Sequence, residues 1–556
     1  MFPPHLTLLY SSAQRAGSDA AFRTPHIVSG SDRAQNWNII TYDQFRRDVD
    51  MAATYWSSIL RDEGIPNHSV IGLWLWGFSY TDVLHIYGIS RAGFVPQLFS
   101  LRLPNAVVIY ELLRKAQTRA LIYDNNLKGV LNDCPIPCHP AVLREDMCLK
   151  NLELPVLETM SPDDTAFIFH TSGSTSGSPK LVPCSHRWIE SAIAKSRQIC
   201  RPKSLNRQDV IVWMGSMCHI AQSFMLFGSI NYGSCIVQPT TLSFAADELV
   251  SMIQHCGVNR LNQFASYLQS HFRTARADPK LLSMLKNLDE VMYSGLALLP
   301  EDENWARKNA IKLRNLFGST ECAAILSSDP LSERNNLLSP LAGFIYRFVP
   351  VQQAQSSHRS TAQLLELVIA AESLDCPDKS LRHHDGDFHT GDLFSEAAPG
   401  LYAFRGRDDD WIKTAIGLRC DTKAIEDNIR MTCPDLVSGC VVVGAGRPSP
   451  VMFIEPGDNE MDEIELKRAI IRATRPFHSR RYTHERITSA DMIVVVPPRT
   501  LPRTATKGNV RRKAVEEAYK PLLDEYTMEL HPYDIVRTPH SAVNDKDRQV
   551  GTPVAE

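Results

Sequence analysis

Small and hydroxyl-bearing residues are concentrated in one ten-residue segment, TSGSTSGSPK, at residues 171–180. It follows the apolar run AFIFH and precedes LVPCSHRWIESAIA, which predicts a turn and then a helix. Because small residues let backbone N–H groups come close to phosphate oxygens, such a loop suits a phosphate chain. The lysine follows Ser-Pro, and the glycines are four apart, so this is not a P-loop. A flexible Ser/Gly linker is the alternative. The candidate phosphate-binding residues are Thr171, Ser172, Gly173, Ser174, Thr175, Gly177 and Lys180.

Four further short segments follow this loop along the chain. They are NLFGSTE at 315–321, Thr-Gly-Asp at 390–392, GRDDDWIK at 406–413, and Pro-Arg-Thr at 502–504 followed by Lys507. In order and spacing, the five segments resemble the motifs of the adenylate-forming superfamily: acyl-CoA synthetases, luciferases and the adenylation domains of nonribosomal peptide synthetases. The resemblance covers about residues 20–525. Within the superfamily, GRDDDWIK…GLRCDTKAIEDNIR is most similar to adenylation domains of fungal nonribosomal-peptide-synthetase-like enzymes.

The segment NLFGSTE carries groups suited to a nucleotide. Phe317 offers a flat apolar face for adenine, and Gly318 lets the backbone pass close by. Thr320 can bond a phosphate oxygen, and Glu321 is a hard oxygen ligand for a Mg²⁺ that bridges phosphates. With Ser319, these residues are expected at the nucleotide, and Glu321 is expected to be catalytic as well. Taken alone, the segment would predict an ordinary loop before a helix.

Asp392 is the candidate ribose-binding residue, because one carboxylate can accept both ribose hydroxyls. The resemblance places Arg407 at the ribose as well. The same neighbourhood has a composition that would suit zinc or iron. Its other acidic and imidazole residues are His383, His384, Asp385, Asp387 and His389. Their spacing alternates within one expected loop and puts no ligands on a helix face. We therefore interpret these histidines as a solvated loop and Asp392 as nucleotide-binding.

Lys507 is the candidate catalytic lysine. Negative charge builds between the carboxylate and the α-phosphate during adenylate formation, and a lysine reaching both would stabilise it. The order here is Lys507-Gly508, whereas the family commonly has Gly-Lys, so Arg511 and Lys513 stay open as alternatives. A basic surface loop is the third interpretation. Asp409, in the polar segment before the C-terminal region, is the expected hinge residue.

The expected acyl pocket has few polar groups. His219 lies in the apolar stretch WMGSMCHIAQSFMLFG, and the resemblance implies that it borders the pocket and gates the carboxylate. A histidine packed in the core is the alternative. Amino-acid-activating relatives place an aspartate just after this position, whereas Ile220 and Ala221 stand here. A buried ammonium without a partner is costly, which predicts a carboxylic acid without an α-amino group. The pocket residues expected are His219, Ile220, Ala221, Gly295, Leu296 and Cys322.

Short apolar runs and helical patterns alternate around these segments. Strands are expected at 69–74, 119–123, 166–170 and 290–293, and helices at 42–60 and 245–256. This alternation predicts an α/β fold with largely parallel sheets. A second pattern near residue 406 predicts a small α+β lid, with strands at 439–443, 451–454 and 492–496 and helices at 423–431 and 462–474. The expected division is 1–405 for a nucleotide-binding body, 406–530 for a mobile lid, and 531–556 for a polar tail.

Composition excludes several classes of protein. The 556 residues include 59 Lys+Arg and 62 Asp+Glu, and this net charge of -3 gives no support to nucleic-acid binding. Thirteen scattered cysteines fit a reducing compartment. No signal peptide is evident at the start, and the most apolar window, 70–89, contains Asp82 and His85, so no membrane span is expected. We expect a cytoplasmic protein.

These features predict an ATP- and Mg²⁺-dependent ligase that converts a carboxylic acid to an acyl-adenylate and passes the acyl group to a thiol. We find no carrier-protein attachment site and no dinucleotide fingerprint, and 49 residues follow Lys507. The expected acceptor is therefore coenzyme A, or the phosphopantetheine of a separate carrier protein. The alternative is a catalytically silent relative that binds nucleotide within a larger biosynthetic complex. The shifted lysine motif favours silence, whereas the presence of Lys180, Glu321, Asp392 and Lys507 opposes it.

Overall fold

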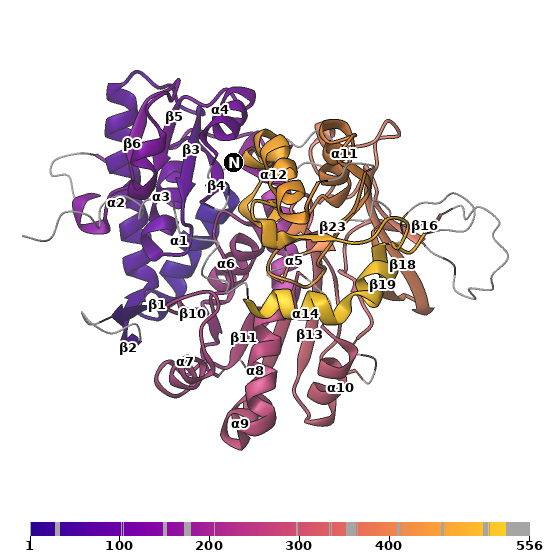
Figure 1. Ribbon diagram of the computed structural model, residues 1–556. Helices are drawn as coiled ribbons and strands as arrows, with labels where there is room; N and C mark the ends of the chain where they lie inside the picture. Colours follow the sequence, from indigo (N-terminus) through magenta and orange to yellow (C-terminus); the bar gives the residue numbers. More distant parts are fainter. Residues whose placement is uncertain are drawn as a thin grey trace, which may run out of the picture.

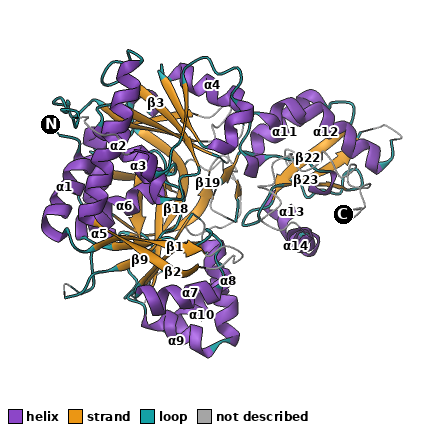
Figure 2. Cartoon of the chain, turned by 90° about the vertical axis from the view of Figure 1, so that its left-hand side faces the viewer, coloured by secondary structure: helices purple, strands orange, loops and turns teal. Residues whose placement is uncertain are grey.

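The protein has a large N-terminal domain and a small C-terminal domain (Figures 1 and 2). The computed structural model describes residues 2–27, 34–101, 103, 105–147, 153–171, 180–204, 206–295, 298–332, 334, 336–351, 363, 365–407, 412–415, 418–457, 461–503, 510 and 512–529. Two large sheets, one smaller antiparallel sheet and their helices form the first domain. The expected α/β class, with a smaller α+β domain at the C-terminal end, is confirmed.

A six-stranded sheet carries the first sequence motif. Its order is β6-β5-β3-β4-β7-β8, and only the β7–β8 pair is antiparallel. The central strands β3, β4 and β5 are short apolar runs with nearly every residue buried, as is usual for parallel strands between helices, whereas the edge strands β6 and β8 are more exposed. Their bounds are β3 (Val70–Leu75), β4 (Val95–Ser100), β5 (Ala120–Tyr123), β6 (Cys138–Pro140), β7 (Thr165–Thr171) and β8 (Lys180–Ser185).

A nine-stranded sheet carries the second motif. Its order is β15-β14-β13-β12-β11-β9-β10-β1-β2, with a parallel centre and antiparallel pairs at both ends. The central strands follow helical connections, as parallel pairing requires. The bounds are β1 (Ala20–Ile27), β2 (Ala34–Thr41), β9 (Val210–Val212), β10 (Cys235–Val237), β11 (Arg260–Phe264), β12 (Glu290–Ser294), β13 (Leu313–Ser319), β14 (Ala323–Ser327) and β15 (Ser339–Pro340).

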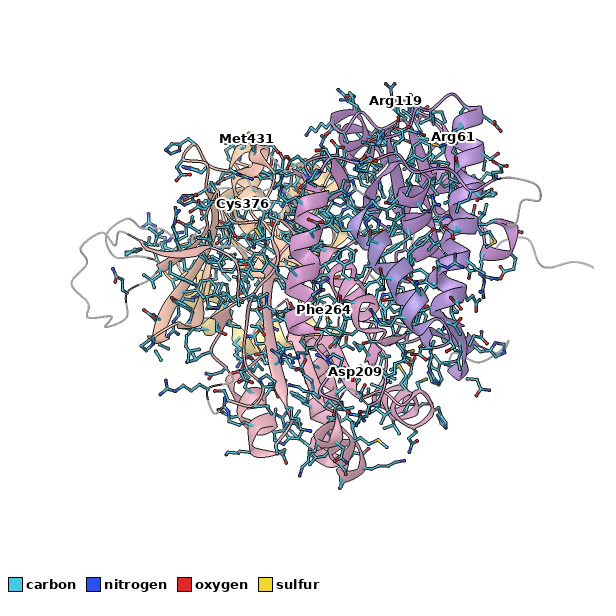
Figure 3. The ribbon with its side chains drawn as sticks, turned by 180° about the vertical axis from the view of Figure 1, so that it is seen from behind. Arg61, Arg119, Asp209, Phe264, Cys376 and Met431 are labelled. Carbon is cyan, nitrogen blue, oxygen red and sulfur yellow. The ribbon has the colours of Figure 1, made fainter. Side chains whose placement is uncertain are left out.

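The main core lies between these two sheets. It takes side chains from both of them and from five helices: α1 (Pro4–Ala16), α2 (Tyr42–Asp62), α3 (Tyr80–Arg91), α5 (His186–Ile199) and α6 (Ile220–Tyr232). Helix α4 (Ala106–Lys115) packs on the other face of the six-stranded sheet. The far face of the nine-stranded sheet is covered by α7 (Ala246–Ser251), α8 (Ala265–Ala277), α9 (Pro279–Asn287) and α10 (Pro300–Lys308). From behind, Arg61 and Arg119 mark the upper, six-stranded half and Asp209 the lower half (Figure 3).

Local sequence sets where the helices begin. Thr41 caps α2 by accepting a hydrogen bond from the Gln44 N–H, at 3.2 Å. At α3, Ser79 and Asp82 form a reciprocal capping box. Each cap satisfies a backbone donor that has no partner within the helix, a contribution of about 1 kcal/mol. These caps fix the residues at which α2 and α3 begin.

A four-stranded antiparallel sheet completes the N-terminal domain. Its order is β16 (Tyr346–Pro350), β17 (Leu365–Ile369), β18 (Phe388–Ala398) and β19 (Leu401–Arg407). Phe394 of β18 packs in one core cluster with Phe317 of β13, so this sheet is joined to the edge of the nine-stranded sheet. The third and fourth sequence motifs are thereby brought against the second.

The C-terminal domain has a two-stranded sheet, a three-stranded sheet and two small apolar cores. Its strands are β20 (Ile412–Lys413), β21 (Arg419–Cys420), β22 (Val437–Val443), β23 (Val451–Pro456) and β24 (Ile493–Val495), and its helices are α11 (Thr422–Thr432), α12 (Glu463–Ser479), α13 (Arg512–Ala518) and α14 (Lys520–Glu529). Figure 2 shows this domain at one side of the larger one. The boundaries at 405 and 530 stay predictions, and Asp409 and the tail 531–556 lie outside the described residues.

Several local predictions were wrong in detail. The residues after the first motif form strand β8 before helix α5 begins, where a turn was expected, because β8 pairs with β7. Asp392 and Arg407 lie on strands, where a loop and a hinge were expected. The predicted helix at 245–256 is α7 followed by a π-helical turn at Met252–Cys256. Strand pairing overrides local propensity in the first two cases, whereas the third is a change of helix type within the expected helix.

Candidate active site

The serine- and glycine-rich segment closes a hairpin. Thr171, at the end of β7, pairs with Lys180, at the start of β8. Lys180 is exposed and Thr171 half-buried. The residues between them, which include the predicted Ser172, Gly173, Ser174, Thr175 and Gly177, lie outside the described residues. The described strands therefore place the two ends of the loop beside each other.

The NLFGSTE segment lies on β13 and the turn into β14. A Cβ atom on Gly318 would lie 2.3 Å from the Ala323 carbonyl oxygen, so glycine is required by the crossing of these two strands. Ala323 itself has a φ of 54°, a left-handed conformation that is uncommon for alanine. The Ser319 hydroxyl accepts from the Cys322 N–H at 3.2 Å, which tightens the turn that presents Thr320 and Glu321. Both of these are half-buried.

The Phe317 ring is mostly enclosed. It is 8% exposed and packs edge-on against Phe394 and at 42° to Phe404, with ring centroids 5.1 and 5.4 Å apart. Most of its surface is therefore used in joining β13 to β18 and β19. The face expected to meet adenine is small in this structure.

Two side chains of α5 hold the turn that carries Glu321. The Trp188 indole N–H donates to the Glu321 carbonyl oxygen at 3.1 Å, and Lys195 donates to the Cys322 carbonyl oxygen at 2.7 Å. Lys195 also forms an ion pair with Asp375, and both side chains are 0% exposed. Burial lowers the pKa of Lys195, and the Asp375 carboxylate offsets part of that effect. Because α5 follows the β7–β8 hairpin, these hydrogen bonds connect the first two motifs.

Asp392 lies in β18, directly opposite Arg407 in β19. It is 1% exposed, and its backbone N–H donates to the Thr390 hydroxyl at 3.0 Å. Gly391 adopts a φ of 68°, and its N–H donates to Glu366 of β17 at 3.1 Å. Two residues 15 positions apart are thus neighbours, as a shared ribose site requires; the Arg407 side chain lies outside the described part.

His219 caps helix α6. Its Nδ1 accepts from the Ala221 N–H at 3.2 Å, and the residue is half-buried. Ile220 is 3% exposed and belongs to the main core, so its apolar character has a packing explanation. Ala221 is half-buried, and the argument against a substrate ammonium therefore depends on Ala221.

The other expected pocket residues are divided. Cys322 is 0% exposed within the cluster that joins β13 to the four-stranded sheet, and burial raises the pKa of its thiol. Gly295 ends β12 with a φ of 88°, and Leu296 lies outside the described residues. Cys322 therefore acts as a packing residue in this structure.

The expected catalytic lysine, Lys507, also lies outside the described residues. Its neighbours before and after are described: Arg503 pairs with the buried carboxylate of Glu455, and Lys513 is exposed on α13. The structure thus fixes both sides of the lysine segment without testing the choice between Lys507 and Lys513.

Sequence reasoning missed Trp188, Lys195 and Glu366. Lys195 stands on the buried face of α5, at helical spacing from Trp188 and Ala192, and a lysine on an apolar face is a signal for a buried ion pair. Glu366 interrupts the apolar strand LELVI, which is a similar signal. Neither residue belongs to a short motif, so only the pattern of neighbours could have indicated them.

The C-terminal domain contacts strand β7, which leads into the serine- and glycine-rich segment. Tyr482 donates a short hydrogen bond to Nδ1 of His170, and the two rings stack at 5.7 Å. Phe99 stacks on the other side of His170 at 5.4 Å. Burial lowers the pKa of His170 to about 4, so the imidazole is neutral. Its Nδ1 can therefore accept the hydrogen bond from the Tyr482 hydroxyl. This contact lies one residue before the loop.

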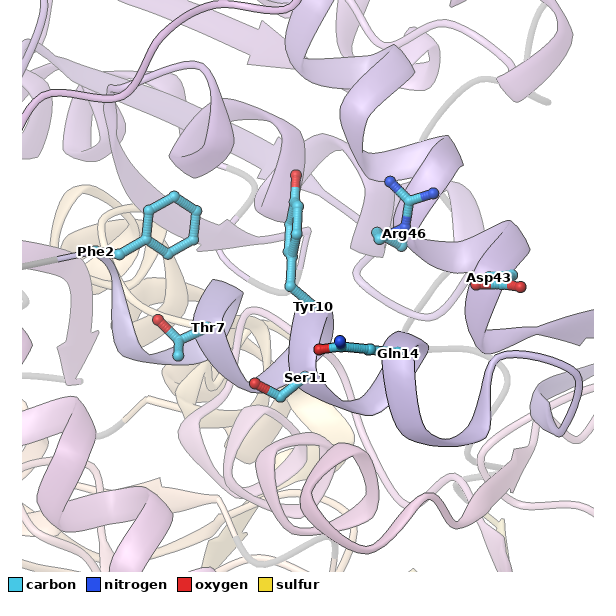
Figure 4. A pocket seen from close by; sticks show the side chains of 7 residues that line it. All are labelled: Phe2, Thr7, Tyr10, Ser11, Gln14, Asp43 and Arg46. Atoms are coloured by element: carbon cyan, nitrogen blue, oxygen red, sulfur yellow. The ribbon is translucent and has the colours of Figure 1, made fainter.

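A surface hollow of about 500 Å³ lies elsewhere, between α1 and α2 (Figure 4). It is lined by Phe2, Thr7, Tyr10, Ser11, Gln14, Asp43 and Arg46. None of these residues belongs to the five motifs. The hollow is therefore not part of the candidate active site, which is identified by motif residues and their contacts.

The chain matches two family models. The model described as AMP-binding enzyme matches residues 12–353, and the model of the AMP-binding enzyme C-terminal domain matches residues 409–529. The AMP-binding domain-containing enzyme iboA of Amanita muscaria (strain Koide BX008) is 35% identical over 513 residues, which are 90% of this chain and 98% of that protein.

More distant relatives extend this similarity. The adenylate-forming reductase stbB of Stachybotrys bisbyi is 25% identical and covers 78% of this chain, which spans 40% of that protein. Among solved structures, o-succinylbenzoate CoA synthetase (MenE) of Bacillus subtilis superposes with a TM-score of 0.69 at 16% identity, over 92% of this chain and 98% of that one. At that identity the superposition shows the fold.

Within the described ranges, every helix is too short or too polar to cross a bilayer.

Proposed function

Because the chain belongs to the AMP-binding enzyme family of adenylate-forming ligases, we propose that it activates a carboxylic acid without an α-amino group and transfers the acyl group to a thiol. A carboxylate oxygen of the acid attacks the α-phosphorus of ATP, and pyrophosphate leaves. The thiol sulfur then attacks the acyl carbon, and AMP leaves. Coenzyme A or the phosphopantetheine of a separate carrier protein is the proposed acceptor.

The observation that carries this proposal is the chain of contacts between motifs. The helix after the phosphate-loop hairpin binds the Glu321 carbonyl through Trp188. Phe317, four residues before Glu321, packs on Phe394 and Phe404, which flank the Asp392–Arg407 pair. Motif segments more than 200 residues apart in the sequence are thereby connected by direct contacts.

The residues present suit ATP and Mg²⁺. The exposed Lys180 and the backbone of the loop before it would hold the phosphates, and the buried Asp392 would hold the ribose. Glu321 would hold Mg²⁺, which neutralises phosphate charge when bound. Trp188 and Lys195 hold the Glu321 turn by its backbone, leaving the Glu321 carboxylate for the ion.

Lys507 is the proposed catalytic residue, and His219 is proposed to border the acyl pocket. Lys507 would stabilise the charge that builds as the acid attacks ATP. The lid residues 406–530, turning about Asp409, would bring Lys507 in for the first step and withdraw it for the second.

The twelve described cysteines are all free, which supports a reducing compartment such as the cytoplasm.

Pyrophosphate release over a panel of acids tests the proposal. The wild type should turn over benzoate-like or medium aliphatic acids, and Lys507→Ala should lower the rate by about 10²–10³-fold. Lys513→Ala is the matched control and should keep its rate. A dead Lys513→Ala beside an active Lys507→Ala would reassign the lysine.

Two further outcomes bear on the substrate and on the class of protein. Better turnover of a proteinogenic amino acid than of every simple acid would refute the argument from Ala221. No pyrophosphate release with any acid, in a protein that binds ATP, would favour the silent relative.

A further inference from the structure

Two histidines and one carboxylate converge on the turn that leads into β18. One ligand atom from each of His383, Asp385 and His389 lies within 4.8 Å of the other two. From the sequence these residues were expected to alternate along one loop, which disfavoured a metal site. In the structure His389 is instead the second residue of a strand, and the preceding turn folds back beside it.

Backbone hydrogen bonds fix this turn. The His383 N–H donates to the Asp387 carbonyl oxygen at 2.8 Å, and the Gly386 N–H donates to the His383 carbonyl oxygen at 3.0 Å. Gly386 has a φ of 88°, which favours glycine. The Asp385 carboxylate accepts from the Asp387 N–H at 3.0 Å. The two turn residues are therefore held close to the strand before any ion binds.

His389 is oriented from behind by a carboxylate. Its Nδ1 lies 3.1 Å from Glu366 Oε2, and its Nε2 lies 3.1 Å from Asp385 Oδ2. Metal-binding histidines usually donate their second ring N–H to a carboxylate, which fixes the tautomer and makes the first nitrogen a better ligand. Here Glu366 occupies that place, whereas Nε2 pairs with Asp385, a contact that a bound ion would replace. The His383 ring lies on the same turn, with its centroid 5.0 Å from that of His389.

The other acidic and imidazole residues of this neighbourhood are not among the three that converge. The Asp387 carboxylate instead accepts from the Ala371 N–H at 2.7 Å and pairs with Arg347 at 2.6 Å. Asp392 is 1% exposed within the nucleotide-binding segment. The His384 ring lies at 53° to that of His383, with ring centroids 4.4 Å apart, but His384 is not one of the three converging residues.

We propose that His383, Asp385 and His389 bind a divalent transition-metal ion, with Zn²⁺ as the best fit. Two imidazoles and one carboxylate match the ligand types that zinc prefers, whereas Mg²⁺ and Ca²⁺ prefer oxygen alone. Three protein ligands on an exposed turn leave coordination positions for water. The site is separate from the Mg²⁺ position proposed at Glu321 and does not depend on the proposed activity.

Zinc titration of the untagged, chelator-treated full chain tests the proposal. Isothermal calorimetry should show saturable binding of Zn²⁺ that excess Mg²⁺ leaves unchanged, and Co²⁺ should give a visible absorption band at the same site. His383→Ala and Asp385→Asn should each weaken binding roughly 10-fold or more. Glu366→Gln removes the orienting carboxylate and should weaken it by about 10–100-fold.

His384→Ala is the matched control, because it removes an exposed histidine from the same turn. It should bind Zn²⁺ as the wild type does, and melting curves of the metal-free variants should show that all are folded. A wild type without saturable Zn²⁺ binding overturns the proposal. So does unchanged binding by folded His383→Ala and Asp385→Asn, or a loss in His384→Ala as large as that in His383→Ala.

Discussion

The inside of the N-terminal domain and its contact with the C-terminal domain use charge differently. Within the domain, Lys195 and Asp375 pair at 0% exposure and hold the turn beside Glu321. Between the domains, Arg480 pairs with Glu111, and these side chains are 40% and 23% exposed. Asn105 adds a hydrogen bond to the Ser479 carbonyl oxygen.

The difference follows from solvation. Removing one member of a buried pair leaves a charge without solvent or partner, whereas water replaces a partner at the surface. The buried Lys195–Asp375 pair therefore holds its turn in one position. The exposed Arg480–Glu111 pair can separate at little cost, because water replaces the lost partner. This contrast fits the proposed role of residues 406–530 as a lid that turns. Five predictions test this contrast, from the largest expected effect to the smallest.

Lys195→Met should destabilise the N-terminal domain by about 3–5 kcal/mol, because it leaves the Asp375 carboxylate buried without its cation, where the neutral hydroxyls of Tyr346 and Ser373 remain as donors. Calorimetry should show a lower melting temperature for that domain. The double variant Lys195→Met/Asp375→Asn removes both charges and should recover part of the loss. Equal melting temperatures of Lys195→Met and wild type would show that this ion pair does not hold the domain together.

Acid should weaken the N-terminal domain through its buried neutral histidines. His85 is 0% exposed; it accepts from the Trp56 indole N–H at 3.0 Å, and burial lowers its pKa from 6.5 to about 4. Between pH 6.5 and 4, His85 is protonated in the unfolded chain and neutral in the folded chain. Stability therefore falls as the pH falls toward 4, by up to about 1.4 kcal/mol per pH unit for each such group. His85→Gln should reduce this slope in calorimetry.

The C-terminal domain should respond less to the same change. Burial raises the pKa of Glu485 to about 7, so between pH 4.5 and 7 the folded state holds a proton that the unfolded state has lost, and stability rises on acidification. Burial lowers the pKa of His478 to about 3, which has the opposite sign. The two effects offset each other between about pH 6.5 and 4.5. Glu485→Gln should make this domain acid-sensitive; an unchanged profile would show that Glu485 does not titrate there.

Tyr482→Phe should loosen the contact between the domains while leaving each domain folded. It removes the hydrogen bond to His170 but keeps the stacked ring, a loss of about 0.5–1.5 kcal/mol. Hydrogen exchange should quicken in peptides that cover β7 and the end of α12. Exchange identical to that of the wild type would mean that stacking alone maintains the contact.

Arg480→Ala should have the smallest effect, about 0.2–1 kcal/mol on the same contact, and high salt should remove the difference. Hydrogen exchange of α4 at low and high salt is the measurement. Arg468→Ala, at an exposed position of α12, the helix that ends just before Arg480, is the control and should match the wild type. A loss as large as that of Lys195→Met would remove the contrast between the two regions.

The sequence alone determined the elements and the family. Apolar runs at 69–74, 119–123 and 290–293 became β3, β5 and β12 within about one residue, because a short apolar run buried on both faces has few alternatives. The family resemblance rested on five ordered motifs and was confirmed by the family models. Motif residues such as Asp392 and Glu321 were candidates by type and order, and their roles stay predictions.

Only the tertiary structure decided which residues support that site. Glu366 lies 25 positions before Gly391 and Lys195 lies 127 before Cys322, yet both bond the backbone of motif turns. It also gave Ile220 and Cys322 a packing role and brought His383 and Asp385 beside His389. Sequence records residue types and spacing along the chain, whereas these contacts depend on how strands far apart in sequence pair and cross. Burial, which sets the cost of each charge, exists only once that pairing is made.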